Sequence, residues 1–384
     1  MPSFEFATAA RILFGEGTLR QVPAAAASMG RRALLVTGAS GERADPLRKT
    51  LEAAHVSIVP FAVPGEPTVD LIRSAPRDCD FVIAFGGGSA LDAGKAIAAL
   101  LTNPGDPLDY LEVIGLGRPL AIRAAPCIAI PTTAGTGSEV TRNAVLASPE
   151  HRVKASLRSP SMLPRLAVVD PELTYELPRA ITASTGLDAL TQLIEPYVSL
   201  RANPMTDQFC VEGMRRAASA LPRLWENGGD GEARGHMAWA SLLGGMALAN
   251  AALGAVHGFA APIGGMFPAP HGAVCAALLP HAMEVNIRAL RARSPENARF
   301  PEKLSRYDEV ARLITCRPHA TAQDGVAWIA ALCQRLEIPP LRTYGVTQND
   351  LDLLVEKAAL ASSMRGNPIV LTGEELREII CRAL

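Results

Sequence analysis

The residues best able to bind a metal ion lie in the second half of the chain. Asp188 and Gln192 are four residues apart in a helical pattern, so both project from one face of a helix. His257 and His271 follow in a segment without charged residues. An aspartate and two histidines from separate helices can converge on a divalent cation, with Gln192 as a neutral fourth ligand. The spacing alone favours the alternative that Asp188 forms a cap or ion pair and that the histidines are hydrogen-bonded core residues.

A second chemical feature is a glycine-rich turn between an apolar run and a helical pattern. The run FVIAF at 81–85 ends in this turn, and a helix is expected over 89–101. The turn consists of Gly86, Gly87, Gly88 and Ser89. Backbone N–H groups at a helix N-terminus bind anions, and glycines let a pyrophosphate approach the backbone. A purely structural tight turn is the alternative for this motif taken by itself.

A similar loop, PTTAGTGSE at 131–139, follows the apolar run CIAI at 127–130. Ligands of open α/β sheets bind at the carboxyl ends of the strands, where both loops are expected. The two loops together therefore predict a phosphate-rich ligand. The pattern differs from the G-x-G-x-x-G fingerprint, so an ordinary Rossmann topology is not implied.

The end of the first apolar run, ALLVT at 33–37, bears on the choice of dinucleotide. An acidic residue that would bind an adenine-ribose 2′-hydroxyl is expected at position 38, and the chain has Gly38 there. Gly38 leaves room for a 2′-phosphate, which Ser40 and Arg43 could bind. This favours NADP slightly over NAD, and both stay open.

The order of apolar runs predicts the fold class. Short continuous apolar runs that alternate with helical patterns are typical of a doubly wound, mostly parallel α/β sheet covered on both faces. After Asp170 such runs become rare and helical patterns fill nearly all of the remaining chain. We therefore predict an α/β dinucleotide-binding domain over residues 1–180 and an all-α metal and substrate domain over residues 181–384.

Composition excludes several classes of partner. The 384 residues include 37 basic and 38 acidic side chains, so no net field attracts nucleic acid or anionic lipid, and a small-molecule partner is expected. Seven scattered cysteines without a C-x-x-C pair, and a start without a signal-like segment, indicate a cytoplasmic protein. The uncharged segment 235–283 is rich in alanine and glycine, which favours close-packed core helices over a membrane span.

Together these motifs resemble the iron-containing (group III) alcohol dehydrogenase family, which includes maleylacetate reductases and is related to glycerol dehydrogenase and dehydroquinate synthase. The resemblance covers nearly the whole chain. It rests on GGGSALDAGKAIA at 86–98, PTTAGTGSEVTRNAV at 131–145, LPRLAVVDPELTYELP at 163–178, STGLDAL at 184–190 and PAPHG at 268–272.

The resemblance implies a dehydroquinate-synthase-like architecture and a set of site residues. For the pyrophosphate it implies the turn Gly86, Gly87, Gly88 and Ser89, and for the nicotinamide side Thr132, Thr133, Thr136 and Ser138. Asp92 and Lys95 match the same motif, and Asp92 is expected to bind the cofactor. Lys154 matches a lysine that reaches the cofactor ribose, and Asn143 matches a position near the substrate. Asp188, His257 and His271 match three of the four metal ligands.

The chain departs from the family pattern at two positions. Gln192 stands where the family metal site has histidine, and an amide oxygen is a poorer ligand for iron or zinc. Ala261 stands where many relatives carry another active-site histidine, so proton transfer needs another group, water or the cofactor ribose. Asp188 and the two histidines still form a three-ligand set with open positions, so Fe²⁺ or Zn²⁺ binding is expected.

The function implied is hydride transfer between NAD or NADP and a small alcohol, aldehyde or ketone, with a divalent metal as Lewis acid on the substrate oxygen. A metal-independent reductase resembling maleylacetate reductase is one alternative. A catalytically inactive nucleotide-binding protein is another. A lyase resembling dehydroquinate synthase is disfavoured, because few basic residues surround His257 and His271. A homo-oligomer, most simply a dimer, is expected from similar proteins.

Overall fold

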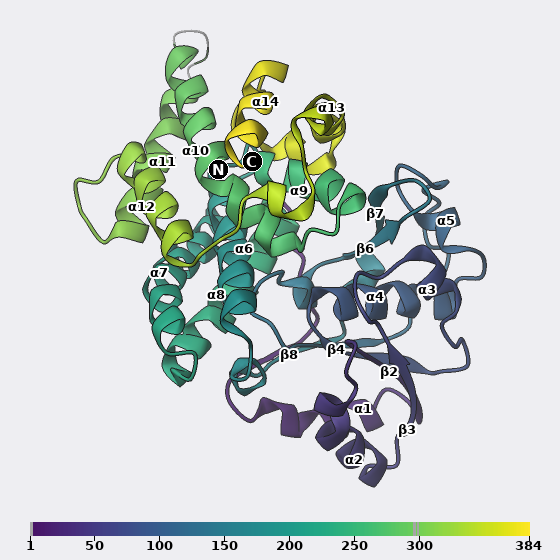
Figure 1. Cartoon of the computed structure of the whole chain (residues 1–384). Helices are drawn as coiled ribbons and strands as arrows, with labels where there is room; N and C mark the ends of the chain where they lie inside the picture. The colour runs from purple at the N-terminus through teal and green to yellow at the C-terminus, as the bar shows by residue number, and fades with distance from the viewer. Residues whose placement is uncertain (1–2, 295–296, 298) are drawn as a thin grey trace. The chain divides into compact units, whose positions relative to one another are not determined.

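The computed structural model describes residues 3–294, 297 and 299–384, and the chain forms two compact units (Figure 1). The α/β unit comprises Ala7–Thr133 and Gly137–Tyr175. The helical unit comprises Glu176–Leu384, the short loop segment Ala134–Thr136 and the described residues up to Phe6. The helical unit thus begins a few residues before the expected boundary at 180/181, and it also takes up two short segments of the first half.

One six-stranded parallel sheet, in the order β1-β8-β5-β4-β2-β3, forms the centre of the α/β unit. Its strands are β1 (Ile12–Phe14), β2 (Arg32–Thr37), β3 (Ser57–Ala62), β4 (Phe81–Gly86), β5 (Cys127–Pro131) and β8 (Leu166–Val169). The three apolar runs noted in the sequence are β2, β4 and β5. They are neighbours in the sheet, since Ala84 pairs with Val36 on one side and with Ala129 on the other.

Both faces of the sheet are covered. Ala33 and Leu35 of β2 join a buried cluster with α1 (Val22–Ala27) and α2 (Asp45–Ala53). The alternate residues Leu34 and Val36 join another cluster, with α3 (Val69–Arg73) and α4 (Gly88–Thr102). Burial on both faces explains why these strands are continuous apolar runs. The expected doubly wound, mostly parallel domain is confirmed.

The order of the strands predicts where a ligand binds. The chain runs from β2 outward to β3 and then returns to form β4 on the other side of β2. The strand order therefore reverses between β2 and β4, and in open α/β sheets the carboxyl ends of two such strands form the ligand-binding crevice.

An antiparallel hairpin completes the α/β unit. It consists of β6 (Asn143–Ser148) and β7 (Val153–Arg158), and Asn143 pairs with Arg158. Buried residues of the hairpin, Ala144 and Leu146 among them, join the same cluster as α4. A short helix, α5 (Pro107–Tyr110), lies in the long connection between α4 and β5.

The helical unit has no strand among its described residues, as predicted. Its helices are α6 (Arg179–Val198), α7 (Pro204–Glu226), α8 (Gly231–Ala251), α9 (Ala255–Met266), α10 (His271–Ala292), α11 (Phe300–Thr315), α12 (Ala322–Arg335), α13 (Leu351–Leu360) and α14 (Gly373–Arg382). In the described part of the chain, no single helix has the length and apolar character needed to cross a membrane. The pair α8 and α9 passes that test jointly, but it is bent by 99°.

Candidate active site

The glycine-rich turn opens helix α4 as a site for an anion. Gly87 is the N-cap residue, and no side chain of the described residues caps the helix, so its first N–H groups remain available to an anion. Gly86 has a φ of +159°, and a Cβ there would lie 2.7 Å from the Cβ of Ala90. Only glycine fits this position without a shift of the helix. The expected strand, turn and helix are all present.

Two further loops reach the same edge of the sheet. The N–H of Thr132 donates to the carbonyl of Gly86 (2.9 Å), and Thr133 lies beside Gly87. Gly38 follows β2, and its backbone N lies 3.4 Å from the Cβ position of Gly86. A Cβ at Gly38 would have no atom within 4 Å, so space is open there. These turns are thus grouped at the carboxyl edge, where the switch in strand order predicts a ligand.

Two residues at the end of β2 bear on the dinucleotide. Ser40 is exposed. The guanidinium of Arg43 donates to the backbone carbonyl of Leu173 (2.6 Å), so it is already partly engaged. The expected preference for a 2′-phosphate therefore loses part of its basis, and it stays a prediction.

Asp92 and Lys95 of α4 bind the loop that leads to β6. Asp92 accepts hydrogen bonds from the Ser138 hydroxyl (2.5 Å) and from the N–H of Val145 (2.9 Å). The buried ammonium of Lys95 donates to the carbonyl of Ser138 (2.9 Å) and to Thr141 (2.8 Å). Both side chains therefore fix the shape of the loop. A direct contact of Asp92 or Ser138 with the cofactor stays a prediction.

Three other expected residues occupy different surroundings. Lys154 is buried on β7 and forms an ion pair with Glu66 (3.0 Å). Asn143 is the half-buried first residue of β6. Thr136 belongs to the helical unit. Their proposed roles toward ribose, substrate and nicotinamide are not tested by these contacts.

The predicted metal ligands converge inside the helical unit. Nε2 of His257, on α9, lies 3.4 Å from Oδ1 of Asp188, on α6, and Nε2 of His271, at the start of α10, lies 3.7 Å from the same oxygen. Asp188 is 1% exposed and His257 6%, whereas His271 is 33% exposed. The backbones of α6 and α10 approach closely, since a Cβ at Gly272 would lie 2.6 Å from the Ser184 carbonyl oxygen.

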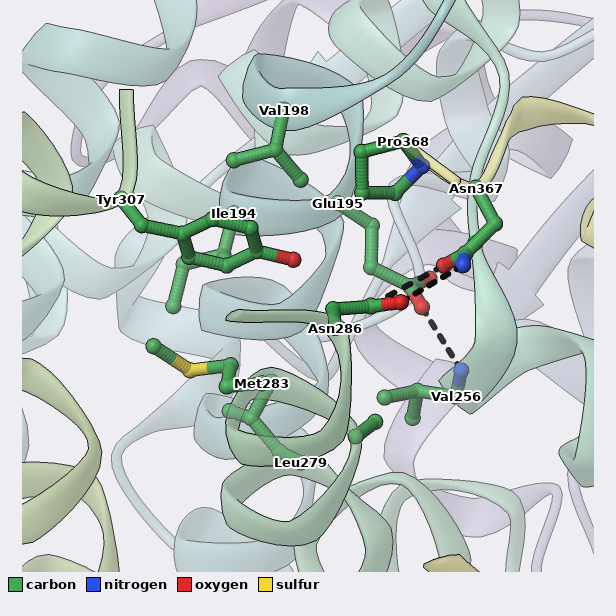
Figure 2. A pocket seen from close by; sticks show the side chains of 12 residues that line it. Ile194, Glu195, Val198, Val256, Leu279, Met283, Asn286, Tyr307, Asn367 and Pro368 are labelled. Carbon is green, nitrogen blue, oxygen red and sulfur yellow. Dashed lines mark hydrogen bonds between the residues drawn. The ribbon is translucent and has the colours of Figure 1, made fainter. Parts of the chain in front are cut away.

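Glu195 orients His257, and this glutamate was not among the site residues predicted from the sequence. Its carboxylate accepts from Nδ1 of His257 (2.7 Å) and from the N–H of Val256 (2.7 Å), as Figure 2 shows for the second of these bonds. A carboxylate only accepts hydrogen bonds, so Nδ1 carries a proton and Nε2 is the ring nitrogen that faces Asp188, where it can bind a metal ion once its own proton has left. The signal was present, because Asp188, Gln192 and Glu195 follow the spacing i, i+4, i+7 of one helix face.

A second missed residue is Cys275. It lies one turn after His271 on α10, and its Sγ is 3.7 Å from Nε2 of His271 and 3.8 Å from Nε2 of His257. The donor atoms of Asp188, His257, His271 and Cys275 all lie within 4.8 Å of one another. The i, i+4 spacing of His271 and Cys275 could have indicated this neighbour.

Two buried oxygens of the cluster have no hydrogen-bond partner among the described residues. They are Oδ1 of Asp188 and Oε1 of Gln192. Buried polar atoms are rarely left without a partner, and a cation held by Asp188 and the two histidines would satisfy Oδ1 of Asp188. The donor set of carboxylate, imidazole and thiol suits a divalent metal, so the residues present fit such an ion.

The charges of the cluster are strongly coupled. Burial by itself would raise the pKa of Asp188, but the two histidines and Gln192 stabilise the carboxylate, and its pKa is lowered. Burial opposes the charge of His257, yet Cys275, Asp188 and Glu195 outweigh it and hold the pKa of His257 well above 6.5. The cluster therefore favours a positive charge at its centre, carried by protons or by a metal ion.

The chain thus combines a parallel sheet, in which a glycine-rich turn opens α4, with a helical unit that contains a buried aspartate-histidine cluster, as expected of a metal-dependent dehydrogenase. The profile described as iron-containing alcohol dehydrogenase matches residues 9–171, and that of the Fe-containing alcohol dehydrogenase family, C-terminal, matches residues 182–384. The chain belongs to the iron-containing alcohol dehydrogenase family.

Individual relatives agree with this assignment. Alcohol dehydrogenase 4 of Schizosaccharomyces pombe is 36% identical over 395 aligned residues, which cover 100% of this chain and 90% of the relative. The crystal structure of a 1,3-propanediol oxidoreductase is similar at a TM-score of 0.89 and 33% identity, covering all of both chains. A sulfoacetaldehyde reductase from Bifidobacterium kashiwanohense, solved in complex with NAD⁺, has a TM-score of 0.84 and 28% identity, covering 99% of this chain and 98% of that one.

The comparisons confirm the family, the fold class and the general function expected from the sequence. The chain is an oxidoreductase of the alcohol dehydrogenase class. A potential metal site is present in the helical unit.

Proposed function

We propose that this enzyme transfers a hydride between NAD or NADP and a small alcohol, aldehyde or ketone, at a site where Asp188, His257 and His271 hold Fe²⁺ or Zn²⁺. The observation that carries the proposal is the convergence of these three side chains around a buried carboxylate oxygen that lacks a partner among the described residues. A divalent cation bound there would supply Lewis-acid polarisation of the substrate oxygen.

On the metal side, each side chain has a distinct task. Asp188 supplies a negative charge that stays ionised, because its pKa is lowered. His257 is held by Glu195 with its Nε2 toward the cluster, and Gln192 offers an unpartnered amide oxygen on the same helix face as Asp188. His271 is the partly exposed ligand, so the substrate oxygen is assigned to its side of the cluster.

On the cofactor side, the pyrophosphate is assigned to the N–H groups that follow Gly87 at the start of α4. Gly38 leaves open space for the adenine ribose and any 2′-phosphate, with Ser40 beside it. Thr132, Thr133, Thr136 and Ser138 are assigned to the nicotinamide side, Lys154 to the ribose, and Asn143 to the substrate. The dinucleotide supplies or accepts the hydride, and the protein positions it.

The proposal includes a small-molecule substrate, a cytoplasmic location and a homodimer. Seven unpaired cysteines are typical of a reducing compartment. A net charge of −1 gives nucleic acid no general attraction. β1 is an edge strand of the sheet, and edge strands commonly pair across subunits. Light scattering coupled to gel filtration tests the dimer.

Steady-state turnover on small alcohols and aldehydes, with both NAD and NADP, tests the function. We expect turnover that is lost on chelation and restored when Fe²⁺ or Zn²⁺ is added. Full activity with a metal content near zero would instead establish a metal-independent reductase. Tight dinucleotide binding without turnover on any substrate would establish a nucleotide-binding protein.

The variant Gly87→Ala tests the cofactor site separately. The φ of Gly87 is −73°, and its Cβ would lie 3.4 Å from the Thr133 methyl group, so alanine fits the fold. The added methyl group would occupy the approach of the pyrophosphate, so we expect NADH affinity to fall at least about tenfold, or about 1.4 kcal/mol, with the melting temperature retained. Gly65→Ala, where a Cβ meets nothing within 4 Å, is the matched control. Unchanged NADH affinity in Gly87→Ala would remove this assignment.

A further inference from the structure

We propose that Cys275 is a ligand of the metal, so that the ion is held by Asp188, His257, His271 and the Cys275 thiolate and is preferentially Zn²⁺. The inference rests on the proposed metal site but assigns a ligand that the site expected from the sequence does not contain. In that expected site, Gln192 supplies the fourth donor.

The four separations that join the imidazole nitrogens to Asp188 and to Cys275 are close to those of a tetrahedral site, and all donor atoms lie within 4.8 Å of one another. With metal–nitrogen and metal–oxygen distances of about 2.0–2.1 Å and a metal–sulfur distance of about 2.3 Å, tetrahedral edges are about 3.3 Å between nitrogen and oxygen and about 3.6 Å between sulfur and nitrogen. The observed nitrogen–oxygen separations, from His257 and His271 to Asp188, are 3.4 and 3.7 Å. The observed sulfur–nitrogen separations, from Cys275 to the same rings, are 3.8 and 3.7 Å.

The surroundings of the sulfur also favour a ligand. Cys275 is fully buried, and its Sγ contacts Nε2 of both His257 and His271. The adjacent Oδ1 of Asp188 is buried and has no hydrogen-bond partner among the described residues. Once the thiol of Cys275 has lost its proton to the solvent, the thiolate and the Asp188 carboxylate together supply two negative charges. They would neutralise a divalent cation.

The nature of the donors then selects the metal. A thiolate is a soft, anionic ligand, whereas the amide of Gln192 is neutral and hard. Mixed sulfur and imidazole ligands in a tetrahedral arrangement are characteristic of zinc. The family pattern has a histidine at position 192, and Gln192 removes that imidazole. Cys275 supplies a stronger donor from the neighbouring helix α10.

X-ray absorption at the zinc edge of the full-length, Zn²⁺-reconstituted protein tests the inference without reference to activity. We expect a zinc–sulfur shell at about 2.3 Å in the wild type. We also expect its loss in Cys275→Ser and Cys275→Ala and its retention in Cys210→Ala, which removes another fully buried thiol of the helical unit. A Co²⁺-substituted sample should show a sulfur-to-cobalt charge-transfer band that the Cys275 variants lack.

Each outcome decides one question. A wild-type spectrum with only nitrogen and oxygen neighbours, or failure of the wild type to bind Zn²⁺ or Co²⁺, would overturn the inference. The wild-type spectrum decides even if the Cys275 variants do not fold. A zinc–sulfur shell in a protein without turnover would support the ligand and refute the proposed function. Turnover with a bound metal that lacks a sulfur neighbour would support the proposed function and refute Cys275 as a ligand.

Discussion

Glu195→Gln should weaken metal binding although Glu195 lies outside the set of donor atoms. The glutamate holds two groups with hydrogen bonds of 2.7 Å, the N–H of Val256 and Nδ1 of His257. In the glutamine variant, the amide oxygen can keep the bond to Val256, but an NH₂ group then faces Nδ1. The ring must place its proton on Nε2, the atom that faces Asp188 and the metal position.

The expected size follows from this change of tautomer. Loss of a carboxylate that orients a metal-binding histidine typically lowers metal affinity about 10- to 100-fold, which corresponds to about 1.4–2.7 kcal/mol. The isosteric glutamine fills the same volume beside the small pocket lined by Ile194 and Val198 in Figure 2, so packing is conserved. The loss should therefore appear in metal affinity and leave the fold intact.

Competition with a chromophoric chelator measures the affinity for Zn²⁺ directly. Glu375→Gln is a suitable control, because Glu375 also accepts an ion-pair hydrogen bond, from Arg293 (2.7 Å), in the same unit. We expect wild-type affinity in the control and the stated loss in Glu195→Gln. A folded Glu195→Gln protein with wild-type affinity would refute the proposed role of the carboxylate in orienting His257.

Two further predictions concern stability. Burial raises the pKa of Glu139 from 4.5 to about 7, so the folded protein retains a proton that the unfolded chain has released, and stability falls as the pH rises from about 4.5 to about 7. Glu139→Gln should match the wild type near pH 4 and exceed it by about 3 kcal/mol above pH 8 in denaturant titrations, and an equal difference at both pH values would contradict this cause. Ala252, between α8 and α9, has a φ of 62° and a ψ of −179°, a conformation that costs about 1–3 kcal/mol outside glycine. Ala252→Gly should raise the melting temperature despite the added flexibility of the unfolded chain, and a decrease would show that the bend is not strained.

The fold could be predicted because its signals are local. Strands β2, β4 and β5 are buried on both faces, so each is an uninterrupted apolar run followed by a glycine or hydroxyl residue. The hairpin of β6 and β7 was not anticipated. Residues of β6 alternate between half-buried and buried, and the hydrogen bond that joins the hairpin to α4, from Val145 to Asp92, spans a long sequence distance.

The metal site was predicted only in part, because some of its residues are brought together by helix packing alone. Asp188, His257 and His271 were identified because the family resemblance points to them, and the structure brings them together. Glu195 and Cys275 match no ligand of the expected pattern, so only their helical spacing could have indicated them. Sequence spacing indicates which residues share one helix face. It does not indicate that α9 contacts α6 and α10, because that contact depends on how the helices pack.

The combination of Gln192 and Cys275 has a consequence for catalysis. Four protein donors around zinc are typical of closed structural sites, whereas catalytic sites keep one position open. His271 is the partly exposed member of the cluster, at 33%, and a small oxygen-containing substrate would have to enter as an additional donor or in place of one. The thiolate should strengthen the hold on the metal and reduce its capacity to polarise a substrate, because it donates more charge than imidazole. Metal affinity and turnover are thus expected to change in opposite directions when Cys275 is replaced by a weaker donor, provided that the weakened site is kept saturated with Zn²⁺.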